Sequence, residues 1–190
     1  MRRRRFIALA TGLSLAGCAR PPAPPPPATP VVIPPPAPAP PPPPPPTIPL
    51  RADRIVVHKA EHRMTLFRGD VPVKSYAVAL GRGGLAPKQR QGDRRTPEGR
   101  YRIVGRNPHS EFHRSLRLSY PEPHEIAAAR ARGDRPGGDI MIHGLRPRLA
   151  WIGALHRRDD WTDGCIAVTN EEIDEIWDAV ADGTPVEILP

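Results

Sequence analysis

Cysteine is scarce in this chain of 190 residues, which contains two. Cys18 closes an N-terminal segment that has its own explanation, so Cys165 is left with no second cysteine to pair with. In an exported protein an unpaired thiol risks wrong disulfides and over-oxidation, and it therefore usually has a function. A small buried apolar residue is the alternative interpretation of Cys165.

Long hydrophobic runs are also missing. The longest N-terminal apolar run covers residues 6–16, whereas a helix needs roughly 20 residues to span a bilayer. Arginines at residues 2–5 precede this run, and its end passes into Leu15-Ala16-Gly17-Cys18. The three zones predict an export signal peptide over residues 1–17.

The end of this segment has a recognisable pattern. Leu15-Ala16-Gly17-Cys18 resembles the lipobox of bacterial lipoproteins, in which cleavage leaves the cysteine N-terminal and lipidated. The resemblance implies a membrane anchor at Cys18 and a periplasmic protein, and Ala19 in place of aspartate suggests the outer membrane. An ordinary secretory peptide is the alternative, and the arginines also resemble a twin-arginine signal.

A large charge excess is missing once the signal is set aside. The formal net charge is +8, but five of the basic residues are those at 2–5 and Arg20, and without them it falls to about +3. Nucleic acid is therefore not an expected partner. No segment has a pattern for a metal, a nucleotide or an organic cofactor.

Proline is abundant, and most of it lies between residues 21 and 49. This stretch has too few apolar residues for a core, and proline-rich chain favours polyproline II at about 3.1 Å per residue. We expect residues 18–50 to form a tether that reaches on the order of 90 Å. A linker without a specific length and a proline ligand for a partner are the alternatives.

Residues 51–190 have the size of one domain, and their hydrophobicity mostly alternates with period two. Asn170 to Ala181 are the exception, because Thr169 and Glu172 form a capping box, apolar residues share one face and Gly183 follows. A weaker helix is expected at 123–132. The pattern predicts a mainly β, sandwich-like or open-barrel-like domain with one or two short helices. The expected strands are 54–58, 64–67, 71–80, 101–104, 116–120, 139–143, 165–168 and 186–189.

His143 is the candidate partner of Cys165. It ends an apolar strand and precedes Gly144, which allows close approach of backbone or substrate. About twenty residues with little regular pattern separate the two, and connections of this length are usually functional or disordered. An adjacent imidazolium would lower the thiol pKa from its usual value near 8.5. The turn at residues 162–164 could aim the Gly164 and Cys165 amides at an oxyanion.

The remaining histidines have simpler interpretations. His58 and His62 lie along extended chain, about 13 Å apart, so one zinc ion cannot bind both. The others lie in polar, loop-like surroundings, and His156 stands out because it falls between the two main motifs. These four are His109, His113, His124 and His156.

Three segments together resemble the L,D-transpeptidase family with a YkuD-type catalytic domain. They are His143-Gly144, Thr162-Asp163-Gly164-Cys165-Ile166 and the Thr-Pro-Glu-Gly stretch at residues 96–99. The resemblance covers residues 53–189 and implies a β-sandwich-like fold. It also implies a cysteine nucleophile that attacks the bond after the third residue of a peptidoglycan stem, forming a thioester that a second stem or a protein amine resolves.

The resemblance assigns roles by position. Cys165 is the nucleophile, His143 the proton donor and acceptor, the Gly144 carbonyl orients the ring, and Gly164 contributes to the oxyanion hole. Two positions depart from the family pattern, because many members have histidine at Asp163 and arginine at Ala167. Candidate substrate contacts are Arg146, Arg157, Trp161, Thr162 and Asp163.

Three functions stay open at this point. The first is a membrane-anchored cysteine acyltransferase acting on peptidoglycan stem peptides, with a wall-attached protein as a further partner. The second uses the same site with water as acceptor, as an L,D-carboxypeptidase or in releasing wall-bound protein. The third is a non-catalytic module that links membrane to wall.

Overall fold

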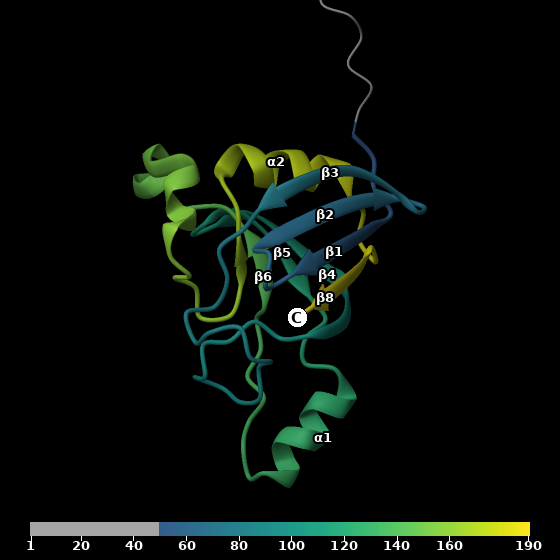
Figure 1. Cartoon of the computed structure of the whole chain (residues 1–190), viewed down its shortest axis with the longest axis vertical. Coiled ribbons are helices and arrows are strands. Elements are labelled where there is room, and N and C mark those ends of the chain that lie inside the picture. Colours follow the sequence, from purple (N-terminus) through teal and green to yellow (C-terminus); the bar gives the residue numbers. More distant parts are fainter. Residues whose placement is uncertain (1–49) are drawn as a thin grey trace, which may run out of the picture. The chain divides into compact units, whose positions relative to one another are not determined.

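The computed structural model describes residues 50–190, which are organised around one curled sheet (Figure 1). The predicted signal peptide, the predicted lipidation at Cys18 and the tether up to residue 49 lie outside the described residues.

Eight strands form the sheet in the order β3-β2-β1-β8-β4-β5-β6-β7. Neighbours are antiparallel except for the parallel pairs β1 with β8 and β6 with β7. This half-barrel confirms the predicted mainly β, open-barrel-like fold. The strands are β1 (Arg54–His58), β2 (Arg63–Arg68), β3 (Val71–Ala77), β4 (Gly99–Ser110), β5 (His113–Leu118), β6 (Met141–His143), β7 (Ile166–Ala167) and β8 (Pro185–Leu189).

The edge strand β3 ends earlier than the sequence predicts. Pro72 cannot donate a ladder hydrogen bond, which suits an edge, and most of the strand is exposed. After Ala77 the chain turns inward, and residues 78–80 become buried. There Ala79 forms an isolated antiparallel bridge with Ala167. The inward turn brings this segment to the strand that follows Cys165.

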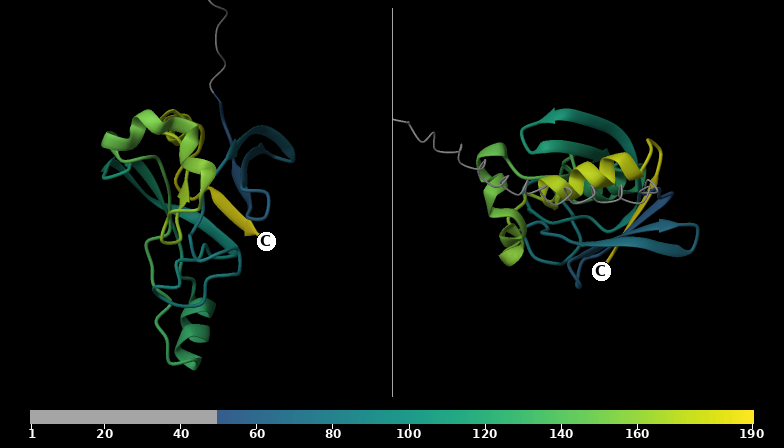
Figure 2. Two further views of the ribbon diagram at one scale, coloured as in Figure 1. Left: turned by 60° about the vertical axis from the view of Figure 1, so that its left-hand side comes forward. Right: turned by 90° about the horizontal axis from the view of Figure 1, so that it is seen from above.

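Two α-helices differ in how they pack. In α2 (Asn170–Ala179) the Thr169 hydroxyl accepts from the Glu172 amide at 3.3 Å, which confirms the capping box. Its buried residues, such as Ile173 and Ile176, face the sheet, and the helix crosses the sheet in the right-hand view of Figure 2. In α1 (Pro123–Ala131) Ala129 is the buried residue, and this helix extends away from the sheet (Figure 1).

The connection between His143 and Cys165 is more ordered than the sequence predicts. It forms a 3-10 helix, η1 (Pro147–Arg158), that is kinked where Gly153 has φ 46° and ψ −131°. The expectation of little regular structure was wrong here, because short 3-10 turns leave no 3.6-residue hydrophobic period to detect. Trp151 is 80% exposed on this helix, with Leu149 and Leu155 also exposed.

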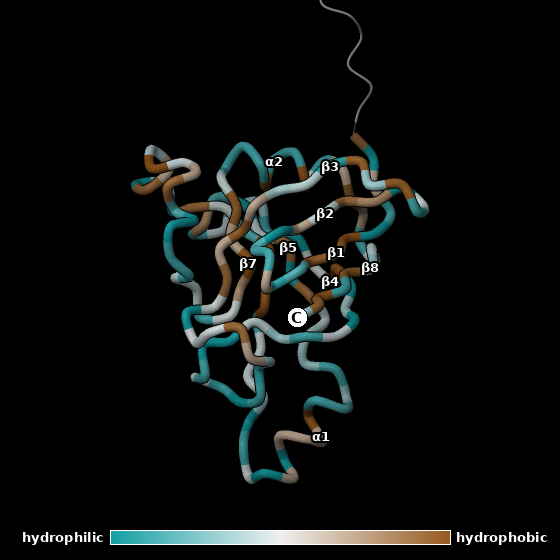
Figure 3. The backbone as a smooth tube through the Cα atoms, in the orientation of Figure 1, coloured by the Kyte–Doolittle hydropathy of each residue, from teal (hydrophilic) through white to brown (hydrophobic). Residues whose placement is uncertain are grey.

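The hydrophobic core lies between the sheet and α2, and every strand contributes to it, with β3 contributing Tyr76. In Figure 3 the brown, hydrophobic stretches gather in the central strands, whereas the loops that flank α1 are largely teal. Among residues 50–190, no helix is both long and apolar enough to cross a membrane.

Candidate active site

Two parallel strands bring Cys165 and His143 to one face of the sheet. Ile142 of β6 pairs with Ile166 of β7, and His143 pairs with Ala167. Because residues two apart on a strand point to the same side, Cys165 lies beside Met141 on the face that presents His143. Both side chains line a cleft of about 780 Å³. The pair that the sequence predicted therefore meets in one cavity.

The His143 ring is held in one tautomer. Its Nδ1 lies 2.7 Å from the Gly144 carbonyl oxygen, and because a carbonyl can only accept, Nδ1 carries the proton and Nε2 is the basic nitrogen. The Phe112 ring lies 4.5 Å and the Trp161 ring 5.7 Å from the imidazole, centroid to centroid. Burial lowers the pKa of His143 to about 4, although the Gly144 bond partly raises it. The imidazole is therefore neutral near pH 7.

The Cys165 thiol is also neutral near pH 7. Burial raises the pKa of Cys165, and the Asp139 and Asp163 carboxylates raise it further, while the Met141 amide lowers it. Its Sγ lies 3.5 Å from the Asp139 carbonyl oxygen, which accepts a hydrogen bond from the S–H group. The expectation of a thiol pKa lowered by an imidazolium was wrong, because burial disfavours both charges. A neutral pair needs His143 to take the proton as the sulfur attacks.

Thr162 closes the turn that carries the cysteine. Its hydroxyl donates to the Cys165 carbonyl at 2.8 Å and accepts from the Gly164 amide at 3.1 Å. Gly164 has φ 131°, and a Cβ there would lie 2.7 Å from the Arg95 carbonyl oxygen. Only glycine fits this position. Because the Gly164 amide already donates to Thr162, the predicted oxyanion role of Gly164 requires that bond to break.

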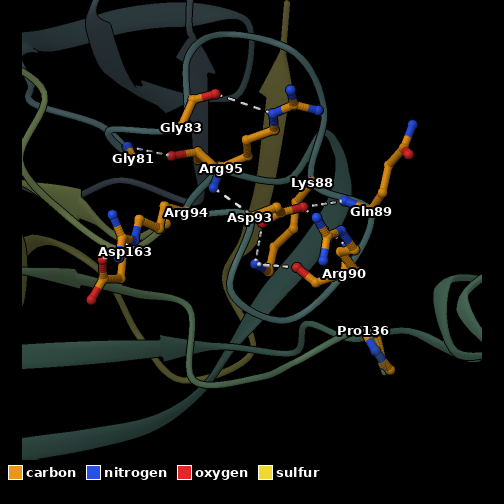
Figure 4. Close-up of polar contacts among 12 residues, drawn as sticks. Gly81, Gly83, Lys88, Gln89, Arg90, Asp93, Arg94, Arg95, Pro136 and Asp163 are labelled. Carbon is orange, nitrogen blue, oxygen red and sulfur yellow. Dashed lines mark hydrogen bonds and ion pairs between the residues drawn. The ribbon is translucent and has the colours of Figure 1, made fainter. Parts of the chain in front are cut away.

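Residues 81–95 form a loop that hydrogen bonds hold together, and this loop packs against the turn that carries the cysteine (Figure 4). The Asp93 carboxylate accepts from Lys88 Nζ at 2.7 Å and from the amides of Gln89, Arg90 and Arg95. Burial by itself raises the pKa of Asp93, but these hydrogen bonds lower it to about 2. A Cβ on Gly81 would lie 2.4 Å from the Arg94 carbonyl oxygen and 3.0 Å from Gly164 Cα. The loop and the cysteine turn thus pack backbone against backbone.

Four of the five predicted substrate contacts line the cleft, namely Arg146, Trp161, Thr162 and Asp163. Arg157 does not line it. Its guanidinium pairs with Glu172 in the first turn of α2, so it supports the helix end. The structure therefore does not support a substrate contact for Arg157.

The two departures from the family pattern have structural partners. The Asp163 carboxylate lies 2.8 Å from Arg82 and 3.7 Å from Arg94 at the cleft mouth. Figure 4 shows Arg94 beside Asp163. Ala167 is fully buried and exchanges two backbone hydrogen bonds with Ala79, at 2.9 and 3.0 Å.

Some cleft residues were missed by sequence reasoning. Asp139 touches the thiol through its backbone, and Phe112 packs on His143, but neither belongs to a motif. The glycine pair before Asp139 was the available signal of unusual backbone. His156 is buried, Trp161 Nε1 donates to its Nδ1 at 3.4 Å, and its Nε2 has no hydrogen-bond partner within residues 50–190. Burial lowers the pKa of His156 to about 4.

The other histidines lie outside the cleft. His62 contacts Asp160 at 3.0 Å, and His113 contacts Asp174 at 2.8 Å. The part of the chain that the structure describes contains no group of three or more potential metal-ligating side chains from His, Cys, Asp and Glu.

Comparison with known proteins gives consistent results. Residues 52–188 match the family model of YkuD, the L,D-transpeptidase catalytic domain. YafK of Escherichia coli strain K12, a candidate L,D-transpeptidase by its name, is 38% identical over 109 residues, which are 56% of this chain and 36% of YafK. The chain thus matches about a third of the length of this curated relative.

Two solved structures share the fold. The helical cell shape determining protein Pgp2 of Campylobacter jejuni superposes with a TM-score of 0.56 at 22% identity, over 73% of this chain and 47% of Pgp2. An L,D-transpeptidase of Xylanimonas cellulosilytica superposes with a TM-score of 0.50 at 16% identity, over 73% of this chain and 61% of that one.

Proposed function

The chain belongs to the YkuD family of L,D-transpeptidase catalytic domains, and from this premise we propose that it remodels peptidoglycan through a thioester at Cys165. The observation that carries the proposal is the cleft in which Cys165 and the Nδ1-protonated His143 lie on one sheet face. The substrate is the bond after the third residue of a stem peptide, and the acceptor is an amine of a second stem or of a wall-attached protein.

The reaction starts from the neutral pair. His143 Nε2 takes the thiol proton as Sγ attacks the carbonyl carbon, and the Gly144 carbonyl holds the ring in the tautomer that leaves Nε2 basic. The imidazolium then returns the proton to the leaving nitrogen, which gives the thioester. An amine attacks the thioester carbon and releases the thiol by the reverse route.

The oxyanion is stabilised by backbone amides of the cysteine turn. The Cys165 amide is the first donor, and the Gly164 amide joins it when Thr162 releases its hydrogen bond. A donor of this kind contributes about 3 kcal/mol to the transition state. The Thr162 hydroxyl retains its bond to the Cys165 carbonyl throughout, which keeps the turn closed.

Arg146 and Trp161 line the binding cleft. Arg146 stacks over Phe112 at 5.0 Å and lies 3.4 Å from the exposed Glu111 carboxylate, so its guanidinium is held at the cleft but remains available to a stem carboxylate. The Trp161 ring lies 5.7 Å from the His143 ring and 6.0 Å from the Phe112 ring, centroid to centroid, so it covers part of the imidazole and limits the water that reaches the thioester. Asp163 restrains Arg82 and Arg94 at the mouth.

The N-terminal pattern completes the proposal. We infer a lipoprotein that is exported to the periplasm and anchored at Cys18 to the outer membrane, with the tether of residues 18–50 carrying the catalytic domain toward the wall. Labelling of the full chain with a fatty acid analogue, compared with Cys18→Ala, tests this anchor.

The proposed reaction is tested by mass spectrometry of muropeptides after incubation with tetrapeptide stems and with protein-linked wall fragments. Cross-linked dimers or exchanged terminal residues that disappear in Cys165→Ala support transpeptidation. Tripeptides or freed protein without cross-links would retain the nucleophile but make water the acceptor. No change in any substrate would contradict the enzyme and favour an anchoring module.

A further inference from the structure

A second, smaller pocket adjoins the catalytic cleft. It has a volume of about 260 Å³, and Asp139 lines both cavities. Arg117 of β5 lines the smaller pocket from the neighbouring strand, where it pairs with Met141, two residues beyond Asp139. The Leu118 amide donates to the Ile140 carbonyl at 2.9 Å, which fixes this register. The small pocket thus lies on the side of Cys165 where Asp139 meets the thiol.

The two charged residues of this pocket, Arg117 and Asp139, do not stabilise the fold through ion pairs within residues 50–190. Both Arg117 and Asp139 are exposed, and neither side chain forms an ion pair within residues 50–190. Arginines nearby are paired, as Arg106 with Asp182 at 2.9 Å and Arg114 with Asp174 at 3.3 Å. A guanidinium and a carboxylate that line one pocket without pairing can each bind a ligand group of opposite charge.

The backbone of Asp139 is held in an uncommon conformation. Its φ is 55°, in the left-handed region, although glycine occupies positions 137 and 138 immediately before it. Left-handed backbone is disfavoured at a non-glycine residue and is often found at functional sites. Here it places the carbonyl 3.5 Å from Cys165 Sγ, and Asp139 lines both cavities.

We propose that this pocket binds the amino acid on the amine side of the reacting bond, with Arg117 taking its α-carboxylate and Asp139 its ammonium group. The proposal rests on the proposed function. Its ligand is an α-amino acid whose reacting nitrogen and carboxylate share one carbon, either a free amino acid or the diamino acid end of a second stem. The volume suits one such head group, and the larger cleft holds the acyl-side peptide.

The chemistry fits both directions of transfer. When Sγ forms the C–S bond the C–N bond breaks, His143 gives the thiol proton to the nitrogen, and a second proton from water makes the ammonium that Asp139 binds. In the reverse direction the ammonium loses a proton to solvent before the amine forms the new C–N bond. The C–S bond then breaks, and the amine's second proton returns through His143 to the thiol. A pocket for the leaving amine is therefore also a pocket for the acceptor.

The first readout tests Arg117 with the full chain and two stem tetrapeptides, one ending in D-alanine and one in D-alaninamide. We expect the wild-type chain to prefer the free carboxylate by about tenfold in kcat/KM, because a charge-assisted bond is lost with the amide. Arg117→Gln should reduce this preference to near unity, whereas Arg68→Gln, an exposed arginine of β2, should retain it. A wild-type chain that cleaves both donors equally overturns the proposal.

The second readout tests Asp139 by the capture of the thioester by amine rather than water. Asp139→Asn keeps a residue that tolerates the left-handed backbone, so the fold is preserved. An activated tripeptide thioester supplies the donor, and deuterated D-alanine or a diaminopimelate tripeptide supplies the amine. Asp139→Asn should lower amine capture about tenfold with donor consumption unchanged, and Asp178→Asn, an exposed residue of α2, should not.

The outcomes distinguish a failure of the amino-acid pocket from a failure of the proposed reaction at Cys165. Reduced capture of both amines supports the shared amino-acid chemistry, and reduced capture of one amine supports the proposal and identifies the source. Amine capture that is unchanged in Asp139→Asn, or absent in the wild-type chain, overturns the Asp139 role. If no donor is consumed at all, the proposed function fails first. Thermal melting curves of all variants verify folding.

Discussion

Lys59 is fully buried just after β1, and its removal gives a sharp test of how the active-site scaffold is held. Its Nζ donates to the Glu98 carboxylate at 2.8 Å, to the Thr96 carbonyl at 3.0 Å and to the Ala86 carbonyl at 3.4 Å. The Thr96 hydroxyl in turn accepts from the Gly81 amide at 3.0 Å. One ammonium group thus ties β1 to the loop that packs behind the cysteine turn.

The magnitude follows from burial. Removing one partner of a buried ion pair costs about 3–5 kcal/mol, because the other charge is left without compensation. The Glu98 side chain is 22% exposed and can regain some hydration, so we expect Lys59→Met to cost about 3 kcal/mol. For a domain of this size that loss lowers Tm by about 10 °C.

Urea denaturation of Lys59→Met, Glu98→Gln and the double variant measures the coupling. We expect the double variant to lose at least about 1.5 kcal/mol less unfolding free energy than the two single variants lose together, because neither charge is then left without its partner. Lys74→Met is the matched control, since its ion pair with Glu175 is exposed and should contribute less than about 1 kcal/mol. A loss in Lys59→Met no larger than in Lys74→Met, or additive single losses, would refute this reasoning.

Three further predictions test the same framework. Gly81→Ala should cost more than about 3 kcal/mol of unfolding free energy or prevent folding, because its Cβ would lie 2.4 Å from the Arg94 carbonyl oxygen. Gly69→Ala, which has open space around it, should cost about 1 kcal/mol, and chemical denaturation compares the two variants. Thr169→Ala should lose about 1 kcal/mol of unfolding free energy with the N-cap of α2. His143 has a folded pKa near 4 against 6.5 when unfolded, so its stabilising contribution is complete above about pH 6.5 and is lost as pH falls toward 4. Between pH 7 and pH 5 the part of the loss that comes from His143 should be about 2 kcal/mol, so His143→Gln should reduce the pH dependence of the unfolding free energy in urea denaturation; an unchanged pH dependence would contradict the buried neutral imidazole.

Much of the sheet could be predicted because its residues follow local rules. Strand β1 is a short apolar run, β2 and β8 mostly alternate in hydrophobicity, and α2 has a capping box and an apolar face that need no tertiary information. The helix was expected to reach Ala181 but ends at Ala179, since helix ends depend on packing as well as on Gly183.

The site was only partly predictable because its geometry depends on contacts between distant segments. The meeting of Cys165 and His143 depends on the parallel register of β6 and β7, and the motif resemblance identified the pair without this register. The role of Arg157 at the end of α2 requires Glu172 to approach it from another element. Asp139 belongs to no motif, and its importance comes from a left-handed φ and a carbonyl beside the thiol, which only the folded backbone shows.

The central claim is that Cys165 becomes acylated. Intact-protein mass spectrometry of the full chain, quenched in acid during turnover of a tetrapeptide stem, tests it directly. We predict a mass increase of one tripeptide acyl group, located at Cys165 by peptide mapping, absent in Cys165→Ala and slower to form in His143→Gln. Turnover that persists in Cys165→Ala, with no adduct on the wild-type chain, would contradict the account.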